Sequence, residues 1–259
     1  MLKQDERLYE EKNNNQGCLM KIVKYNHTSD IVVEFQDEYK FRTSTTYHNF
    51  KSGSVKNPYF PSVYGVGMVG VKYPRSVECK NIREYDIWNN ILERSYSPKY
   101  KKRQPSYTEV SCCKEWLNYE NFYEWLHSQP NFDKWSNGER WAIDKDILKK
   151  GNKIYCPENC CLVPQSVNCL FLKREARRGD LPIGVRKNGK LFEATSSNPL
   201  VGRKIEKLGK YETIEEAFQA YKKYRENLIK QVAQIEFNNG NIIKECYEAM
   251  MNYEVEIND

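Results

Sequence analysis

The strongest constraint on the fold is that the hydrophobic period changes twice along the chain. Two alternating, β-branched runs at 19–25 and 30–35 flank a turn-forming segment, which predicts a β-hairpin. From residue 82 apolar side chains recur at helical spacing, and after residue 181 short strand-like runs precede another helical segment. Only 39% of the residues are hydrophobic, which is low for one thick core. The sequence therefore predicts an α+β protein made of several small modules.

The net charge of +6 is unevenly spread along the chain, with a local excess of basic residues between 171 and 231. Residues 171–231 contain 15 basic and 8 acidic side chains. Clustered basic charge favours nucleic acid as a partner, although a solvated surface explains the same composition. No run approaches the roughly 18 continuous apolar residues of a membrane helix. Since the segment 1–16 is polar and mixed in charge, we expect a cytoplasmic protein with no membrane partner.

The nine cysteines raise the question of disulfides or zinc. Without a secretory signal, free thiols in a reducing cytosol are expected. A zinc ribbon needs two cysteine knuckles, and only Cys156 and Cys160 approach the spacing of one. The sequence therefore predicts no structural zinc.

Two helical segments precede the centre of the chain, at 82–96 and 116–126, and their tryptophans are expected to be core residues. Between them, residues 99–103 predict an exposed basic loop. Such a loop suits phosphate contacts, although it could simply be solvated. Its candidate DNA-binding residues are Lys101, Lys102 and Arg103.

The C-terminal third combines short strands with a well-marked helix. Thr213 and Glu216 form a capping box, which predicts a helix that runs to about Ala233. Short motifs in this third resemble, in their order, the apetala/ethylene-response-factor type of DNA-binding domain: Gly184-Val185, Glu193-Ala194, Leu208-Gly209, Thr213, Glu215-Glu216-Ala217 and Ala220-Tyr221.

This resemblance implies a three-stranded sheet that enters the major groove of double-stranded DNA, with the helix packed behind it. The DNA face that it implies carries Arg186, Lys187, Lys190, Arg203, Lys204 and Lys207. An arginine in the groove can read guanine, whereas lysines mainly hold phosphate. The strand tryptophan of the plant family is lacking here, with Phe192 nearby, so no base preference is predicted. The competing interpretation is a generic sheet and helix with ordinary surface lysines.

Residues 143–168 contain the candidate catalytic and metal-binding residues. Asp144 is followed by Asn159 and, nine residues later, by Asn168. This arrangement resembles the ββα metal finger of phage HNH (His-Me finger) homing endonucleases. The resemblance implies that Asp144 and Asn168 hold one Mg²⁺ or Mn²⁺ ion and that Asn159 orients the catalytic side chain. A hard cation with oxygen ligands suits the scissile phosphate. The competing interpretation is that Asp144 and Asp146 cap a turn and the asparagines are loop residues.

Lys145 departs from the family pattern, which has a general-base histidine at this position. A protonated amine cannot accept a proton, although lysine can act as a base where burial lowers its pKa. Lys145 is therefore the base of a variant nuclease, or a phosphate clamp beside a metal that activates water unaided, or part of an inactive site. His127, on the second helical segment, could fold toward the centre but is more simply structural.

The sequence predicts a phage or mobile-element DNA-binding protein of the HNH endonuclease type that nicks or cuts double-stranded DNA in the cytoplasm of a bacterial host. One alternative is a catalytically inactive DNA-binding regulator on a decayed scaffold. Another is a protein that blocks a host factor through residues 17–72. The expected modules are a polar leader (1–16), an SH3-like β module (17–72), a helical and finger domain (73–172), a linker (173–180), a sheet-and-helix domain (181–235) and a helical tail (236–259).

Overall fold

The computed structural model describes residues 6–172, 179–202 and 204–258 of the chain. Helices and several small sheets alternate along it, which confirms the α+β class. It divides into two compact units, Met1–Trp125 and Leu126–Asp259. Across the described ranges, no helix is both long enough and apolar enough to cross a membrane. Most of the predicted linker (173–178) and Arg203 lie outside the described residues.

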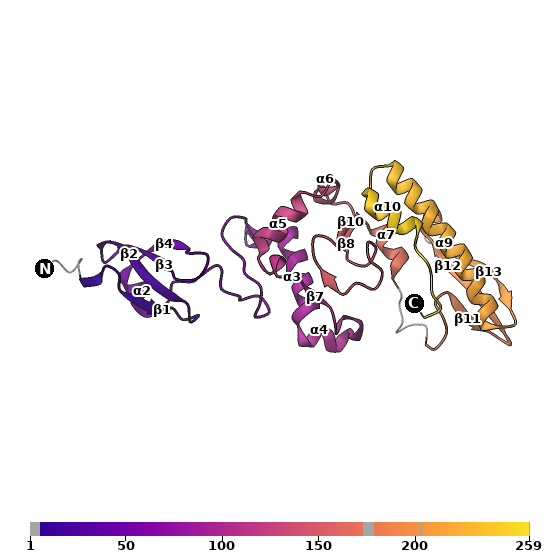
Figure 1. The fold of residues 1–259 in the computed structure, drawn as a ribbon, viewed down its shortest axis with the longest axis horizontal. Coiled ribbons are helices and arrows are strands. Elements are labelled where there is room, and N and C mark those ends of the chain that lie inside the picture. Colours follow the sequence, from indigo (N-terminus) through magenta and orange to yellow (C-terminus); the bar gives the residue numbers. More distant parts are fainter. Residues whose placement is uncertain (1–5, 173–178, 203, 259) are drawn as a thin grey trace. The chain divides into compact units, whose positions relative to one another are not determined.

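A four-stranded sheet with the order β1-β2-β3-β4 opens the first unit (Figure 1). Its elements are β1 (Glu11–Asn13), β2 (Leu19–His27), β3 (Asp30–Phe35) and β4 (Arg42–Thr45), and α2 (Tyr47–Ser52) follows. The predicted hairpin is confirmed, because Met20 pairs with Phe35 and Tyr25 with Ile31 across antiparallel strands. Buried residues of β2 and β3 pack with Phe50 of α2 into a small core. Alternation along the strands thus directs one side of the sheet into that core.

The rest of the first unit is mainly helical. Its elements are β5 (Ser76–Val77), β6 (Lys80–Asn81), α3 (Arg83–Tyr96), α4 (Pro98–Arg103), β7 (Ser111–Cys112) and α5 (Tyr119–His127), with short 3₁₀ turns at Pro105–Tyr107 and Glu115–Leu117. The first predicted helix matches α3. Trp88 and Trp116 are almost fully buried, and the indole nitrogen of Trp88 donates to the Trp116 carbonyl at 2.7 Å. The expectation of core tryptophans is therefore confirmed for Trp88 and Trp116, whereas Trp125 is only partly buried.

The predicted basic loop at 99–103 is wrong in its conformation, because these residues form helix α4. Ser97 caps the helix by accepting a hydrogen bond from the Tyr100 N–H, and Pro98 occupies the first helical position. Proline suits that position because its fixed φ is helical and it has no N–H to satisfy. A Ser-Pro pair is also common in turns, but here it starts a helix.

The second unit begins with a small two-stranded sheet and a helix. Its first elements are α6 (Phe132–Ser136), β8 (Trp141–Asp144), β9 (Ile154–Tyr155), β10 (Cys161–Pro164) and α7 (Gln165–Asn168), with a 3₁₀ turn at Cys169–Phe171. β8 pairs antiparallel with β10, so that Asp144 lies opposite Cys161. α7 follows β10 directly and packs against β8. The strands that pair are thus joined by residues 145–160, a longer connection than a tight hairpin turn.

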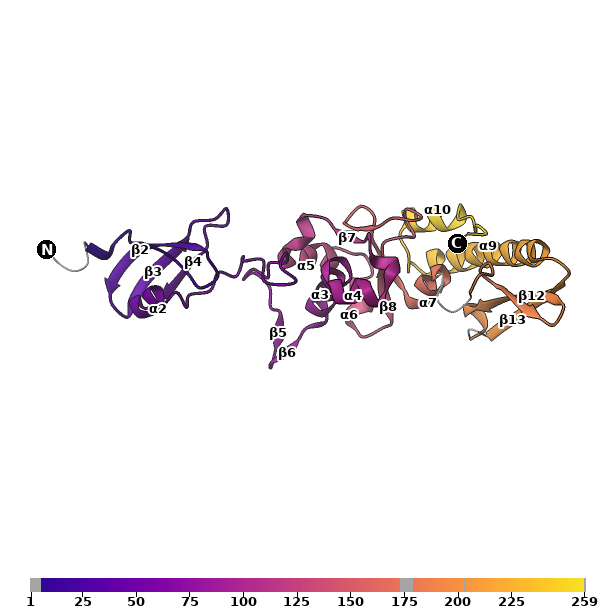
Figure 2. The ribbon, with the colours of Figure 1, turned by 90° about the horizontal axis from the view of Figure 1, so that it is seen from below.

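A second sheet with a long helix completes this unit. Its elements are β11 (Val185–Asn188), β12 (Leu191–Asn198), β13 (Lys204–Tyr211), α9 (Ile214–Asn238) and α10 (Lys244–Met251), with a 3₁₀ turn at Pro199–Val201. The sheet is antiparallel with the order β11-β12-β13, and α9 lies along one of its faces (Figure 2). The predicted capping box of Thr213 and Glu216 is confirmed, although the helix ends at Asn238.

Helix α9 contributes to two cores. Its first half packs on the sheet through three buried residues, Ala217, Phe218 and Tyr221. Its second half packs with α10 and with residues of β10 and α7 through Leu228, Ile229, Val232 and Ala233. One helix thus contributes to both cores, and the domain boundaries expected from the sequence stay predictions.

Candidate functional site

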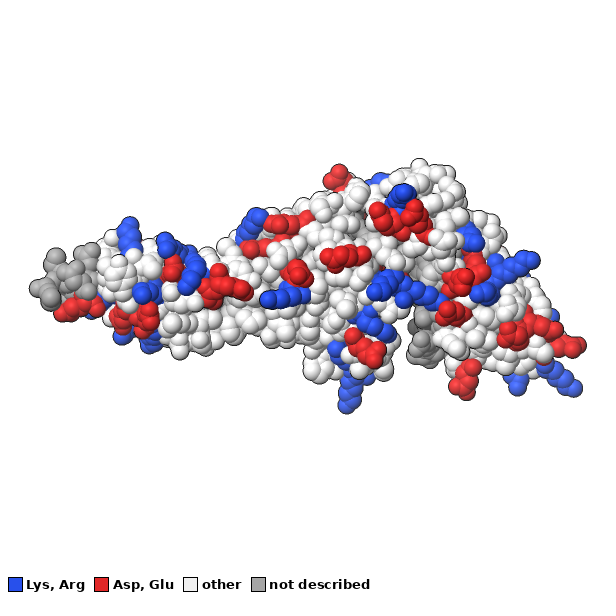
Figure 3. Space-filling model, viewed as in Figure 1, with Lys and Arg blue, Asp and Glu red and all other residues white. Residues whose placement is uncertain are grey.

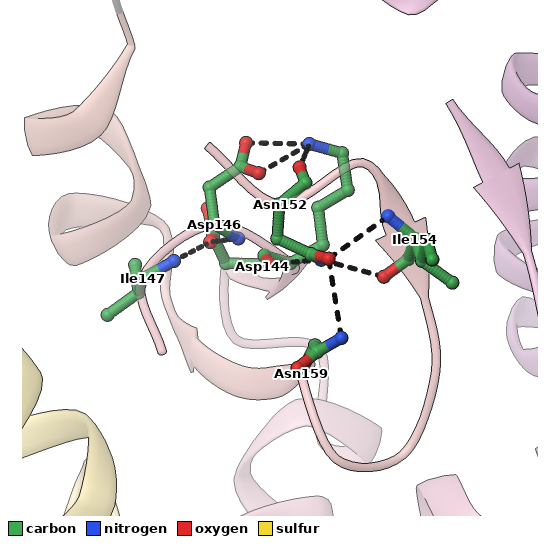
Figure 4. Close-up of polar contacts among 7 residues, drawn as sticks. Asp144, Asp146, Ile147, Asn152, Ile154 and Asn159 are labelled. Carbon is green, nitrogen blue, oxygen red and sulfur yellow. Dashed lines mark hydrogen bonds and ion pairs between the residues drawn. The ribbon is translucent and has the colours of Figure 1, made fainter. Parts of the chain in front are cut away.

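Asp144 ends strand β8 and caps the turn that follows it. Its Oδ1 accepts hydrogen bonds from the backbone N–H groups of Asp146 at 2.7 Å and Ile147 at 2.8 Å (Figure 4). The residue is only 8% exposed, and this burial raises the pKa of its carboxyl group. Asp144 therefore caps the turn through its Oδ1 atom, as one of the two interpretations predicts. Within the described ranges Oδ2 accepts no hydrogen bond from another residue, so it is open to a further ligand.

Lys145 points its ammonium group into the same loop. Its Nζ lies 2.6 and 2.7 Å from the two carboxylate oxygens of Asp146 and 3.1 Å from the Asn152 carbonyl oxygen. The residue is 9% exposed, and its Nζ is 5.9 Å from the centre of the Tyr155 ring. Since a lysine ammonium has three N–H donors, these three acceptors use all of them. Lys145 thus connects the start of the loop to its far side.

Asn152 organises this loop, although it is not among the site residues predicted from the sequence. Its side-chain amide donates to the carbonyl oxygens of Lys145 at 2.8 Å and Ile154 at 2.7 Å. Its Oδ1 accepts from the Ile154 N–H at 3.2 Å and from Asn159 Nδ2 at 3.3 Å. Among the described residues, hydrogen bonds through Asn152 link Asn159 to Lys145, and Figure 4 shows Asn159 beside Asn152. The sequence signal for this role is an asparagine directly after a glycine. Gly151 forms the bend, with a φ of 75°.

Asn168 is the last residue of α7 and is partly exposed. Within the described part of the chain its side chain makes no hydrogen bond to another residue, so its amide oxygen is open to a ligand. Because α7 packs against β8, the structure brings the helix that carries Asn168 to the strand that ends at Asp144. The structure thus joins the two elements that the resemblance assigns to a metal.

The chemistry of these donors fits one hard divalent ion. Asp144 Oδ2 and the Asn168 amide oxygen are hard ligands of the kind that Mg²⁺ and Mn²⁺ take from proteins. A buried carboxylate with a raised pKa also gains from a nearby cation. Among residues 6–172, 179–202 and 204–258, however, no three His, Cys, Asp or Glu side chains cluster as a metal site. Asp144 and Asn168 are the residues that would hold such an ion.

His127, the histidine that could have folded toward the centre, packs against an aromatic ring instead. The ring of His127 lies against that of Phe132, with 3.9 Å between the ring centres. The chain has three histidines, and the other two, His27 and His48, are in the first unit. The hydrogen bonds of the Asp144 loop given above involve none of the three.

The predicted DNA-binding residues of the sheet divide between its two faces. Arg186 and Lys207 lie on the face away from α9, which we call the outer face, opposite Glu193 and Thr195. Lys210 lies there too, and sequence reasoning missed it. The outward position of Lys210 follows from its register opposite Glu193. The alternation of the strands assigns two other predicted residues, Lys187 and Lys204, to the side of α9, and Lys190 lies in the β11–β12 turn.

The basic residues of α4 have different roles from one another. Lys101 Nζ donates to the carbonyl oxygens of Thr108 at 2.9 Å and Val110 at 3.2 Å, so it holds the following turn in place. Lys102 and Arg103 are exposed. Where charges are coloured in Figure 3, basic and acidic side chains alternate over the drawn face and form no continuous positive patch.

Comparison of the chain with protein-family models, with curated proteins and with solved structures finds no match. The assignment of a function therefore depends on the geometry of the Asp144 loop and of the sheet.

Proposed function

We propose that the chain binds double-stranded DNA through the outer face of the β11–β13 sheet, and that the centre around Asp144 does not cut DNA by general-base catalysis. In this proposal residues 181–235 act as a DNA-binding module of the apetala type. Residues 141–168 form a finger of the HNH type that has lost its base. The SH3-like assignment of residues 17–72 stays a prediction.

The outer face supports the DNA-binding half of the proposal. Arg186, Lys207 and Lys210 are exposed there, while α9 covers the opposite face. A narrow antiparallel sheet of this kind can enter the major groove of B-form DNA. Lysines at its surface would hold phosphates, and each phosphate contact would release counterions. Binding that depends steeply on salt is the expected signature.

The position of Lys145 carries the other half of the proposal. Its three ammonium protons are donated to Asp146 and to the Asn152 carbonyl, so the group has no lone pair to accept a proton from water. To act as a base it would have to lose a proton while it faces a carboxylate at 2.6 Å. The geometry supports a lysine that closes the loop rather than one that activates water.

A binding titration tests the first half. Fluorescence anisotropy of a labelled random-sequence duplex should give an affinity that falls linearly with the logarithm of salt concentration. Lys207→Ala and Lys210→Ala should each reduce that slope by about one. Lys230→Ala, which removes the same charge from an exposed position on α9, is the matched control and should leave the slope unchanged. Absent or salt-independent binding would refute the proposal.

One observation favours a second candidate, metal-dependent cleavage. Asp144 Oδ2 and the Asn168 amide accept no hydrogen bond from the described residues, and both suit an Mg²⁺ or Mn²⁺ ion. A bound ion would supply Lewis-acid stabilisation of the scissile phosphate. Asp144 would hold the ion, Asn152 would keep the loop closed, and Lys145 would keep its ion pair with Asp146.

A supercoiled-plasmid assay with Mg²⁺ or Mn²⁺ separates the two candidates. Nicking by the wild-type chain that disappears in both Asp144→Ala and Asn168→Ala would establish the second candidate. Lys145→His provides a sharper comparison. Nicking that appears only in this variant would mean that the metal centre is intact and that only the base is missing, as we propose.

A further inference from the structure

The central strand of the C-terminal sheet places a nearly buried carboxylate on the outer face. Glu193 of β12 is 2% exposed, although it lies on the face away from α9, between Arg186 on β11 and Lys210 on β13. Its Oε2 accepts from Arg186 Nε at 2.6 Å and lies 2.5 Å from Arg186 Nη2. The Arg186 guanidinium holds the pKa of Glu193 below its usual range, and Asn188 and Lys207 act in the same direction. This carboxylate is therefore ionised and firmly held.

The two contacts to Glu193 use one particular edge of the guanidinium. A guanidinium has five N–H donors in a planar fork, and the edge formed by Nε and Nη2 faces the carboxylate. The end-on edge, formed by Nη1 and the outer proton of Nη2, stays clear of Glu193. The Arg186 side chain is 54% exposed, so that edge can reach a ligand. An end-on edge matches two parallel acceptors.

We propose that Glu193 is a positioning residue that fixes the end-on edge of Arg186, so that Arg186 discriminates among DNA sequences rather than adding charge-driven affinity. This inference rests on the proposed DNA-binding function. The ion pair with Glu193 is nearly neutral as a unit, so it contributes little to counterion release. Its fixed plane makes the contact directional, and a directional contact distinguishes acceptor patterns at base edges. The exposed lysines Lys207 and Lys210 supply the sequence-independent attraction.

The test uses the full chain and a duplex selected from a random pool by the wild-type protein. The measured quantity is the ratio of affinities for the selected duplex and a scrambled one, at several salt concentrations. Glu193→Gln should reduce this ratio by about five-fold or more while the salt slope changes by less than one. Lys210→Met, a neighbour in the same row, should weaken both duplexes alike and reduce the slope by about one.

A charge-swapped double variant separates positioning from a merely structural ion pair. Arg186→Glu combined with Glu193→Arg keeps a cross-strand pair but moves the guanidinium to the central strand. It should restore the melting temperature that either single change lowers, yet leave the affinity ratio low. An affinity ratio restored along with the melting temperature would overturn the inference. So would a Glu193→Gln protein that discriminates as the wild type does, or a selection that enriches no sequence.

A measurement without DNA keeps the two proposals distinguishable. In nitrogen-15 spectra, the Arg186 Nε–H should exchange slowly with water in the wild type and rapidly in Glu193→Gln. Slow exchange together with no DNA binding would refute the proposed function while leaving the arginine fixed. Rapid exchange in the wild type would overturn the positioning role even if DNA binds.

Discussion

Replacing Asn152 with alanine should loosen the loop between β8 and β10. The side chain is 8% exposed and makes four hydrogen bonds. Two are donated to the carbonyl oxygens of Lys145 and Ile154, and two are accepted from the Ile154 N–H and from Asn159. Alanine makes none of these bonds, so the backbone groups that they satisfy would lose their partners.

The size of the effect follows from these four bonds. A lost hydrogen bond that leaves a buried partner unsatisfied costs about 1 to 3 kcal/mol, and one whose partner gains water costs less. The Lys145 bond is buried, whereas the bonds to Ile154 and Asn159 are only partly buried, and the Asn159 bond is long at 3.3 Å. The expected loss of local stability is therefore about 2 to 3 kcal/mol.

Hydrogen exchange of the full chain measures this loss where it occurs. Amides of residues 144–155 should exchange about 30 to 150 times faster in Asn152→Ala, which corresponds to 2 to 3 kcal/mol. Asn159→Ala is the matched control, because it removes only the long bond to Asn152. Its exchange should rise by about five-fold or less. Equal acceleration in the two variants would refute the idea that Asn152 organises the loop.

Three further changes test other parts of the second unit. Gly184→Ala should lower the free energy of unfolding by about 3 kcal/mol or more, because φ is +79° and the new Cβ would lie 2.0 Å from a ring carbon of Tyr221. Gly189→Ala is the control. Its φ is +65° but the new Cβ would meet no atom, so it should cost only about 1 kcal/mol. Arg225→Met should lower the free energy of unfolding by about 3 kcal/mol. The Arg225 guanidinium donates to the carbonyl oxygens of Leu170 at 2.6 Å and Ser197 at 3.1 Å, and both would lose their partner. An unchanged melting temperature would contradict this prediction. Hydrogen bonds from Tyr224 and then Asn198 hold the pKa of Glu206 below its usual range. The stability from this carboxylate is therefore fully present above that range and is lost as the pH falls through the lowered pKa. Tyr224→Phe should shrink this acid-dependent loss in melting experiments between about pH 2 and pH 6, and an unaltered profile would count against it.

Local patterns predicted the elements that depend on local physics. The hairpin at 19–35 follows from β-branched alternation around a turn, and α3 follows from apolar side chains at helical spacing. The start of α9 follows from its capping box. Each of these signals lies within a few residues of the structure that it specifies.

Elements that depend on distant contacts could not be predicted in the same way. The pairing of β8 with β10 skips residues 145–160, and nothing in the sequence of either strand specifies that partner. The sharing of α9 between two cores requires knowing which apolar stripe meets which neighbour. The turn-like appearance of Ser97-Pro98 concealed a helix cap, because the same pair suits both structures.

The candidate site shows the same division. Asp144, Asn159 and Asn168 were chosen for their residue types and spacing, and the structure places them at the end of β8, in the loop and at the end of α7. The role of Asn152 depends on four contacts spread over residues 145–159, which no spacing rule contains. The position of Lys210 on the outer face could not be predicted, because that face is defined only once the register of β12 and β13 is known.

The most direct test of the account is one gel in which supercoiled plasmid is incubated with the wild-type chain and Mg²⁺ at increasing salt. The account predicts that the plasmid is retarded at low salt, that the retardation disappears as salt rises, and that the recovered plasmid stays supercoiled. Plasmid that migrates freely at the lowest salt would contradict DNA binding. Recovered plasmid that is nicked by the wild type but not by Asp144→Ala would contradict the proposal of a centre that does not cut DNA and would favour the second candidate, metal-dependent cleavage.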